Sequence, residues 1–439
     1  MQFLGSTSQQ IFDCIRSLVI NAELLPGDAL PPVRELADIL EVNRNTVSSA
    51  YKRLAKAGIA VTQGRLGTTI CAPPSAGEQE GLSIDSRLID LADGNPNPKF
   101  LADPLVLFSA SALKRFLYGE ATILPELHAI GASWFAPDCP ESYTLELTHG
   151  AVDAIERLVA AHLVVGDKVA VEDPCFLGTQ NVLRLAAIET VGIAMDDQGM
   201  LPQALSAALS QGVRAVIITP RAQNPSGCSL SANRAQALQK IISGHPNVLI
   251  IVDDHFALLA EADYYSVISQ STTHWALIRS TSKGLGPDLR VAMLASDPVT
   301  ATRLRARLAP GMSWISHILQ TIVAIALASK EVADQLCEAQ AAYQKQRAHL
   351  CCALRAQSIA VNQNADGLNI WIAIVVDEMA LCHALAKRGW LVRPGKAFQV
   401  KTKDPAIRVT VSKLQEAQAQ KFASDLSICM RQLTRRALA

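Results

Sequence analysis

Apolar residues recur every three or four positions through the first sixty residues of the chain, a spacing that predicts amphipathic helices. The first helix is predicted over residues 8–22, with apolar positions at Ile11, Ile15, Leu18 and Val19. A second, shorter helix is predicted from the PPVRELADIL segment, because Pro32 suits a first helical turn. A third helix follows a tight turn, with Asn43 or Asn45 as its cap and Gly58 at its end.

Residues 59–71, with the sequence IAVTQGRLGTTIC, alternate instead of following the helical period. This alternation, together with its glycines, predicts a two-stranded wing. Three helices followed by such a hairpin form a winged helix-turn-helix, so we expect a DNA-binding domain over residues 1–71.

The pattern changes after residue 71. Residues 72–90 are rich in proline, serine, glycine and acidic residues, which predicts a linker. Over residues 91–439, short apolar runs alternate with helical segments. This alternation predicts an α/β domain with a mostly parallel sheet and helices on both faces. Ligands bind at the carboxyl ends of strands in such sheets, where polar segments follow the predicted strands at residues 221–227, 253–255 and 281–283.

Composition narrows the class of protein. The chain has 40 basic and 40 acidic residues, so any nucleic-acid surface must be local. No apolar run approaches the length of a membrane span, and the N-terminus lacks the pattern of an export signal. Ten cysteines are dispersed without CxxC pairs, which indicates buried thiols in a reducing compartment. We therefore expect a cytoplasmic protein and no metal site.

The polar face of the third predicted helix is basic and rich in amides, with Asn43, Arg44, Asn45, Thr46, Ser48, Lys52 and Arg53. Arginine and asparagine read base edges in the major groove of DNA, and threonine or serine binds phosphate. The alternative is a solvated face on a three-helix packing domain. The segment resembles the DNA-binding domain of the GntR family, with its proline-led helix, V-x-R-x-T-V and a glycine in the wing. That resemblance implies DNA contacts at Arg34, Arg44 and Thr46, with Gly67 letting the wing approach the backbone, and Asn43 and Asn45 complete the predicted set.

A lysine follows a serine-rich run in IRSTSKGLGPDLR, residues 278–290. Schiff-base chemistry with an aldehyde cofactor needs such a lysine, near a phosphate that hydroxyls and a second cation bind. Taken alone, a surface lysine in a polar loop is the alternative. Elsewhere, LELTHGAVDAIE starts a predicted helix at a Gly-Ala-Val turn, which offers an anion site at its N-terminus.

From about residue 90 to its end, the chain resembles the fold-type I, pyridoxal-phosphate-dependent aminotransferases. The resemblance rests on LADGNPNP, LTHGAVDAIE, VEDPCF, TPRAQNPSG, VDDHFALL, SKGLGPDLR and AIRVTVS. Because this part follows a GntR-like DNA-binding domain, the chain is identified as a member of the MocR subfamily of transcriptional regulators. The sequences of its motifs are similar to those of a member linked to vitamin B6 metabolism. The resemblance implies a smaller C-terminal α+β subdomain and a homodimer, usually arranged head to tail.

The resemblance also implies a role for each matching residue. Lys283 matches the Schiff-base lysine, Asp253 the carboxylate that pairs with the pyridine nitrogen, and Asn224 the amide on the ring hydroxyl. Phe176 matches the aromatic residue stacked on the ring, with a core phenylalanine as an equal alternative. Arg408 matches the arginine that grips an effector or substrate carboxylate. The phosphate cradle corresponds to Ala151, Val152, Ser280, Ser282 and Arg290, with Tyr118 supplied by the partner subunit.

Two residues depart from the family pattern. His255 stands where a tyrosine is usual, and we expect its titration near neutral pH to alter the cofactor's electronics while it still reaches the ring hydroxyl. Asp288 replaces a glycine beside the phosphate site; it is either solvated at the rim or weakens phosphate binding. Both changes place efficient transamination in doubt more than cofactor binding.

We therefore expect a regulator that binds pyridoxal 5'-phosphate and duplex DNA, with the cofactor as effector and a vitamin B6 salvage or related gene as target. One alternative is a working aminotransferase that carries a DNA-binding head. A second is a DNA-binding repressor with a vestigial scaffold. The amphipathic stretch 329–356 serves either packing or dimerisation, and the sequence leaves both open.

Overall fold

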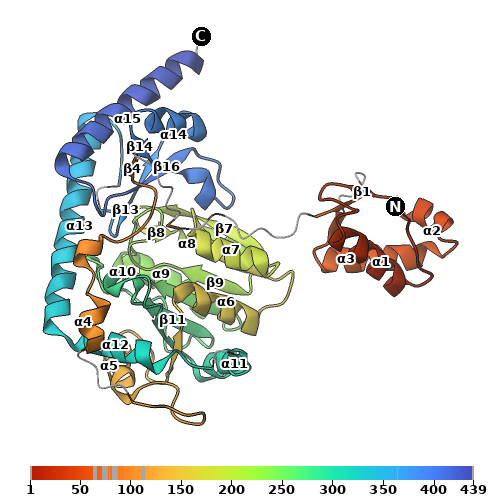
Figure 1. Ribbon diagram of the computed structural model, residues 1–439, viewed down its shortest axis with the longest axis horizontal. Coiled ribbons are helices and arrows are strands. Elements are labelled where there is room, and N and C mark those ends of the chain that lie inside the picture. Colours follow the sequence, from red (N-terminus) through yellow and green to blue (C-terminus); the bar gives the residue numbers. More distant parts are fainter. Residues whose placement is uncertain are drawn as a thin grey trace. The chain divides into compact units, whose positions relative to one another are not determined.

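The computed structural model describes residues 2–62, 67–71, 78, 80–81, 88–109, 114–311, 313–362 and 364–437. The chain divides into two compact units, Met1–Gly77 and Glu78–Ala439 (Figure 1). The division falls inside the segment that the sequence predicts as a linker. In the described part of the chain, no helix is both long and apolar enough to cross a lipid bilayer.

The N-terminal unit packs three helices against a small antiparallel sheet. The helices are α1 (Ser8–Ile20), α2 (Val33–Ile39) and α3 (Arg44–Lys56). The strands, in spatial order, are β1 (Ala29–Leu30), β3 (Thr68–Ile70) and β2 (Ala60–Thr62). Thr7 and Gln10 cap the start of α1 reciprocally, and Asn43 caps α3 through a hydrogen bond of 2.8 Å from the N–H of Asn45. The core of this unit includes Ile11, Ile15, Leu36, Val47 and Leu54.

Local details of this unit differ from the sequence prediction. Helix α1 ends at Ile20 instead of residue 22, and Pro32 is the N-cap of α2 instead of a residue in its first turn. Strand β1 is not predicted at all, because two residues are too few to show an alternation. The turn of the predicted wing, residues 63–66, lies outside the described residues.

A sheet of eight strands runs through the larger unit, in the order β5-β12-β11-β10-β9-β6-β7-β8. Its strands are β5 (Thr144–Thr148), β6 (Lys168–Asp173), β7 (Glu189–Asp196), β8 (Gly199–Met200), β9 (Ala215–Ile218), β10 (Leu249–Asp254), β11 (Trp275–Ser280) and β12 (Ala292–Ser296). The pairings from β7 through β6, β9 and β10 to β11 are parallel. Strand β12 is antiparallel to both of its neighbours, and β8 is antiparallel to β7. The predicted mostly parallel sheet is confirmed.

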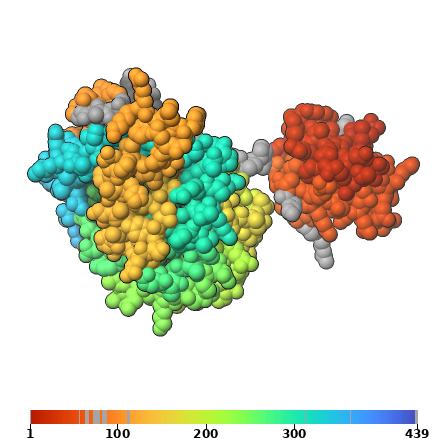
Figure 2. Space-filling model, turned by 90° about the horizontal axis from the view of Figure 1, so that it is seen from below, coloured from red at the N-terminus to blue at the C-terminus, as the bar shows by residue number. Residues whose placement is uncertain are grey.

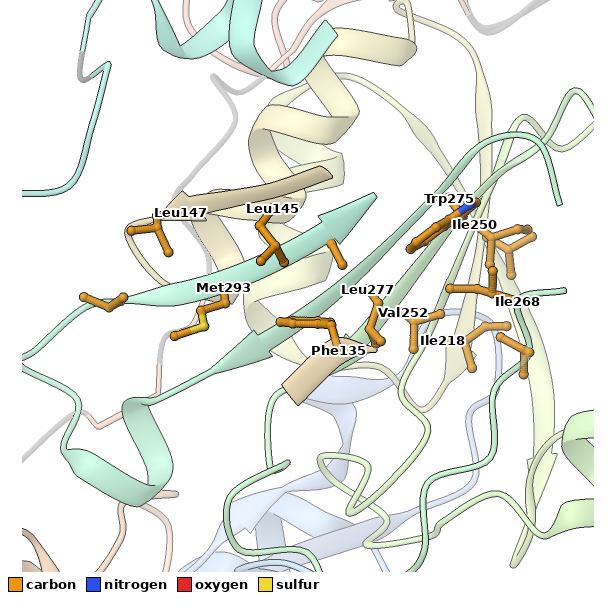
Figure 3. Packing of buried hydrophobic residues seen from close by; sticks show 14 of the residues in the cluster. Phe135, Leu145, Leu147, Ile218, Ile250, Val252, Ile268, Trp275, Leu277 and Met293 are labelled. Carbon is orange, nitrogen blue, oxygen red and sulfur yellow. The ribbon is translucent and has the colours of Figure 1, made fainter. Parts of the chain in front are cut away.

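Helices cover both faces of this sheet, because alternate residues of its buried strands point to opposite sides. Ile250 and Val252 of β10 face a core shared with α5 (Pro125–Phe135), α9 (Ala232–Ser243) and α12 (His317–Ala328). Figure 3 shows this core, with Phe135 of α5 beside Leu277 and Val252. Leu249 and Ile251 face a second core with α6 (Ala151–His162), α7 (Leu177–Leu185) and α11 (Pro298–Leu308).

The rest of the larger unit is the smaller α+β subdomain. Strand β16 (Ala406–Thr410) pairs antiparallel with β13 (Asn369–Ala373) and β15 (Arg393–Pro394). One apolar cluster joins this sheet to α14 (Glu378–Ala386) and α15 (Glu416–Ala437). Helix α13 (Lys330–Ala356) runs along one side of the unit and packs against α15 (Figure 1). Its residues Leu350 and Leu354 lie in the same cluster, so the amphipathic stretch serves packing within this chain.

The sequence places the end of the linker at residue 90, which is too late in the chain. Residues Ile89–Asp90 form strand β4, which pairs in parallel with β14 (Trp390–Leu391) of the smaller subdomain. A two-residue strand in a polar segment shows no periodicity, so the sequence alone could not separate it from the linker.

Candidate cofactor-binding site

A cavity of about 270 Å³ opens at the carboxyl ends of the parallel strands. It is lined by Glu80, Gly81, Asn95, Ala151, Val152, Phe176, Asn224, Asp253, His255, Ser280, Ser282, Lys283, Pro287 and Arg290. Most of these residues lie at or just after the ends of β5, β6, β9, β10 and β11, which are far apart in the sequence. The cavity therefore gathers the predicted cofactor residues, with the exception of Tyr118.

Lys283 lies on the short helix α10 (Ser282–Leu285), directly after β11. Its Nζ donates a hydrogen bond of 2.8 Å to the carbonyl oxygen of Gly94. Burial lowers the pKa of Lys283; the Glu80 carboxylate opposes this shift, and the Arg408 guanidinium adds to it. A lowered pKa leaves more of the amine neutral, the form that attacks a carbonyl group.

Asp253 presents an unpaired carboxylate oxygen in this cavity. Its Oδ1 is buried and has no hydrogen-bond partner in the described part of the chain. Burial, and to a lesser extent the neighbouring carboxylate of Asp254, raises the pKa of Asp253 to about 7. Leaving such an atom unpaired is costly, and a protonated ring nitrogen would satisfy it. The residues present thus fit the pyridine end of pyridoxal phosphate.

The N-terminus of α6 also borders the cavity. The helix begins at Ala151 after Gly150, which has a φ of +93°. The first amide groups of a helix have no partner within it and favour an anion. A Cβ at Gly150 would lie 3.1 Å from Nη2 of Arg290, so the guanidinium passes close to the backbone here. With the hydroxyls of Ser280 and Ser282 beside them, these groups fit a phosphate.

Arg408 already binds a carboxylate of this chain. It is fully buried on β16, and its guanidinium forms two hydrogen bonds with Glu80, the one from Nη2 to Oε2 measuring 2.9 Å. Asn224 contacts both side chains: its Oδ1 accepts a bond of 3.1 Å from Arg408, and its Nδ2 donates one of 3.1 Å to Glu80. The residues predicted for an effector carboxylate and for the ring hydroxyl are therefore linked through Glu80.

Sequence reasoning missed Glu80. The residue lies in the segment predicted as a linker, where acidic residues are common, and no motif or periodic pattern marks it. The missing signal is a long-range one, because its partner Arg408 is more than three hundred residues away in the sequence.

His255 and Asp288, the two departures from the family pattern, have different outcomes. Burial, and then the positive charge of Lys283, lowers the pKa of His255 to about 4. The expectation that His255 titrates near neutral pH is therefore wrong, because the imidazole is shielded from water beside a cation. Asp288 is exposed, which agrees with a solvated position at the rim.

The two aromatic residues predicted for the site, Phe176 and Tyr118, differ in their position relative to the cavity. Phe176 is only partly buried and borders the cavity, which favours contact with a ligand over a place in the core. Tyr118 is 91% exposed, and its ring contacts Trp314 instead of the cavity. Its predicted role as a residue supplied to the partner subunit stays a prediction.

The predicted DNA contacts lie at the surface of the N-terminal unit. Thr46 is partly exposed, and the exposed ones are Arg34, Asn43, Arg44, Asn45 and Gly67. A Cβ at Gly67 would meet nothing within 4 Å, so the backbone there is open to an approaching partner.

Arg53, part of the predicted polar face of the third helix, also contacts the first helix. Its guanidinium lies 5.3 Å from the centre of the Phe12 ring and donates a hydrogen bond to Gln9. Arg53 therefore ties α3 to α1, a role that the helical period alone does not distinguish from a DNA contact.

Both parts of the chain match known families. Residues 7–70 match the bacterial regulatory proteins of the gntR family, and residues 95–426 match aminotransferase class I and II. The chain therefore belongs to the MocR subfamily of GntR-type transcriptional regulators, which join these two parts.

Similar proteins include several named regulators. The chain is 47% identical over 422 residues to the vitamin B6 salvage pathway transcriptional repressor PtsJ of Salmonella typhimurium, which covers 96% of this chain and 98% of that one. It is 25% identical to the HTH-type transcriptional regulator TauR of Rhodobacter capsulatus, with 90% of each chain covered. It is 27% identical to the pyridoxine biosynthesis regulator PdxR of Corynebacterium glutamicum, over 57% of this chain and 56% of that one.

Solved structures show the fold of the larger unit. The multiple substrate aminotransferase of Thermococcus profundus superposes with a TM-score of 0.72 at 19% identity, covering 80% of this chain and 93% of that one. The kynurenine aminotransferase of Pyrococcus horikoshii gives 0.71 at 20% identity, covering 79% and 92%. At this identity the likeness shows the fold alone, which is that of the fold-type I aminotransferases.

Proposed function

We propose that this chain binds pyridoxal 5'-phosphate and represses a vitamin B6 salvage or related gene, with the cofactor as its effector. The unpaired Oδ1 of Asp253, in the same cavity as the Lys283 amine, is the observation that carries cofactor binding. The similarity to PtsJ, whose name states a role in vitamin B6 salvage, supports the target and the sign of regulation.

Each part of the cavity has a task in this proposal. When bound, pyridoxal phosphate supplies an aldehyde and an electron-withdrawing ring. Lys283 offers a buried amine with a lowered pKa, and Asp253 would hold the proton at the ring nitrogen. Asn224 would bind the ring hydroxyl, Phe176 would stack on the ring, and neutral His255 would offer a hydrogen-bonding group beside it. The phosphate would take the α6 N-terminus with Ser280, Ser282 and Arg290.

The N-terminal unit would bind the operator. In the proposed complex α3 enters the major groove, where Arg44, Asn43 and Asn45 contact base edges and Thr46 a phosphate. Arg34 and the wing at Gly67 would contact the DNA backbone. In this proposal residues 1–71 bind the DNA and the larger unit binds the effector.

In this proposal the protein acts as a head-to-tail homodimer. Large apolar side chains are exposed on α4 (Pro104–Ser109) and later in the sequence, among them Leu105 at 76% and Leu117 at 74%. Figure 2 shows this face of the larger unit, where α4 and α5 lie against α12. Large apolar side chains exposed in this way favour an interface. Exposed Tyr118, next to Leu117 in the chain, would then reach the phosphate of the partner subunit.

The direct test is binding of the purified protein to the region upstream of its own gene, with and without pyridoxal phosphate. We expect the cofactor to change the affinity for DNA by about tenfold, because an effector couples to DNA with about 1–3 kcal/mol. Equal affinity in both conditions, with the cofactor demonstrably bound, would exclude it as the effector.

A working aminotransferase is the second candidate, and the presence of Lys283, Asp253 and Asn224 in one cavity favours it. The two candidates differ in turnover. Mixing the cofactor-loaded protein with a panel of amino acids and following the visible spectrum separates them. Rapid multiple turnover supports the enzyme, whereas an unchanged spectrum together with cofactor-dependent DNA binding supports the regulator.

A further inference from the structure

The carboxylate of Glu80 sits where the sequence predicts the carboxylate of a small-molecule ligand. It accepts hydrogen bonds from Nη1 and Nη2 of Arg408 and from Nδ2 of Asn224. A guanidinium that binds both oxygens of a carboxylate is the arrangement by which arginine recognises a free carboxylate ligand. In this structure the chain itself supplies that group.

Charge, hydrogen bonds and local backbone geometry hold Glu80 in this position. Burial alone would raise its pKa, but the charge and hydrogen bonds of Arg408 outweigh burial, so the net pKa is lowered and the group stays ionised. The N–H of Gly81 donates to the carbonyl oxygen of Asp93 at 3.0 Å, which fixes the neighbouring backbone. Gly94 provides the space, because a Cβ there would overlap Oε2 of Glu80.

Two further contacts hold the same segment. The carbonyl oxygen of Glu78 accepts a hydrogen bond of 2.8 Å from Asn181, and its carboxylate lies 3.2 Å from Nη2 of Arg393. The side chain of Glu78 is 57% exposed, whereas that of Glu80 is 17% exposed. Of these two residues, which carry the same charge, Glu80 lines the cavity and Glu78 lies outside its lining.

We propose that Glu80 is a built-in carboxylate ligand of Arg408, which excludes small carboxylates, amino acids included, from the cavity unless they displace it. Glu80 takes the carboxylate-binding arginine and leaves Oδ1 of Asp253 unpaired, so the part that fits a pyridine ring stays available. The same protein could then accept pyridoxal phosphate while discriminating against amino-acid substrates.

Glu80 links the carboxylate-binding arginine to the start of the larger unit. Glu80 follows closely after Gly77, the last residue of the N-terminal unit. A carboxylate ligand that binds Arg408 must displace the side chain of Glu80. The contacts of Glu78 with Asn181 and Arg393, and of Gly81 with Asp93, are then no longer reinforced by the bond between Glu80 and Arg408. Binding of a carboxylate ligand is therefore coupled to how firmly the start of the larger unit is held. The strength of this coupling depends on how well the ligand competes with Glu80 for Arg408.

The proposal is tested by titrating propionate, a carboxylate without an amine, into the cofactor-loaded protein and into the cofactor-free protein. Isothermal calorimetry measures its affinity for the wild type, Glu80→Gln and the matched control Glu78→Gln. We expect Glu80→Gln to bind propionate at least tenfold more tightly than the wild type, equivalent to about 1.4 kcal/mol, because the amide competes less well for the guanidinium. Glu78→Gln should bind like the wild type.

Equal affinity of the wild type and Glu80→Gln would overturn the proposal, as would the same gain in Glu78→Gln. A second measurement uses the wild type alone, in case Glu80→Gln fails to fold. Saturating propionate should accelerate hydrogen exchange in the peptide that contains Gly81, and unchanged exchange would count against displacement of Glu80. Because the cofactor-free arm needs no pyridoxal phosphate, these outcomes are distinguishable from a failure of the proposed effector.

Discussion

Asp253 and Asp254 are adjacent at the end of β10, yet only one of them is paired. Asp254 accepts hydrogen bonds from Arg221 and Arg279, including one of 2.6 Å from Nη2 of Arg221. Oδ1 of Asp253 has no such partner in the described part of the chain. Successive residues of a strand point to opposite faces, so this pair has one carboxylate satisfied within the protein and the other available to a ligand.

The unpaired carboxylate predicts a pH dependence in the cofactor-free protein. The pKa of Asp253 is raised from 3.8 to about 7 in the folded state. Between those values the folded form holds a proton that the unfolded form has lost, so the free energy of unfolding decreases as pH rises through this window. The slope contributed by one such proton is about 1.4 kcal/mol per pH unit at most.

Asp253→Asn should remove this contribution. We expect the variant to lose less stability than the wild type between pH 4 and pH 7, as measured by urea unfolding at several pH values. Asp288→Asn, which changes an exposed carboxylate near the same site, serves as the control and should follow the wild type. A wild-type slope in Asp253→Asn would show that this carboxylate does not hold the proton.

Lys283→Ala should abolish covalent attachment of pyridoxal phosphate while the protein stays folded. Borohydride reduction followed by mass spectrometry should label the wild type and the control Lys240→Ala, which removes an exposed lysine of α9. The Lys283→Ala protein should remain unlabelled and lose the visible absorbance of the bound cofactor. Equal labelling of all three proteins would assign the attachment to another amine.

The sequence predicted much of this site because its residues lie in short motifs at strand ends. TPRAQNPSG, VDDHF and STSK each follow a buried apolar run, and the parallel sheet brings their ends together. The pKa of His255 could not be predicted in the same way. It depends on burial and on the distance to Lys283, which only the folded chain defines.

Weak or long-range features account for the other differences. Strands β1 and β4 have two residues each, too few for a detectable period. The contact of Glu80 with Arg408 joins a polar segment to a distant strand without any local pattern. Arg53 is a basic residue at a position on the predicted polar face, as a DNA-contacting residue would be. Its cation–π contact with Phe12 depends on how α1 packs on α3, which the sequence does not show.

Arg44→Ala should weaken operator binding by about 1–3 kcal/mol, or roughly fivefold to 150-fold, if Arg44 contacts a base. The side chain is exposed at the start of α3, so its removal should leave the stability of the domain nearly unchanged. Arg16→Ala, an exposed arginine of α1, is the matched control for the lost charge. Binding to the upstream DNA is measured by fluorescence anisotropy at fixed salt. If both variants bind equally well, α3 is not the recognition helix.

Gly150→Ala tests whether the close approach of Arg290 to the α6 N-terminus forms the phosphate site. A Cβ at Gly150 would lie 3.1 Å from Nη2 of Arg290, so the guanidinium would have to shift by a few tenths of an ångström. Gly150 also has a φ of +93° and a ψ of 169°, so alanine adds a backbone strain of about 1–3 kcal/mol that must be separated from the crowding.

Gly166→Ala provides that separation, because Gly166 has a φ of +90° but a Cβ there would meet nothing within 4 Å. Both variants should lose similar stability in thermal unfolding. Only Gly150→Ala should bind pyridoxal phosphate more weakly, by about tenfold or 1.4 kcal/mol, in a titration followed by visible absorbance. Inorganic phosphate should compete with the cofactor in the wild type and in Gly166→Ala, and less effectively in Gly150→Ala. If the two variants bind the cofactor equally well, the phosphate lies elsewhere in the cavity.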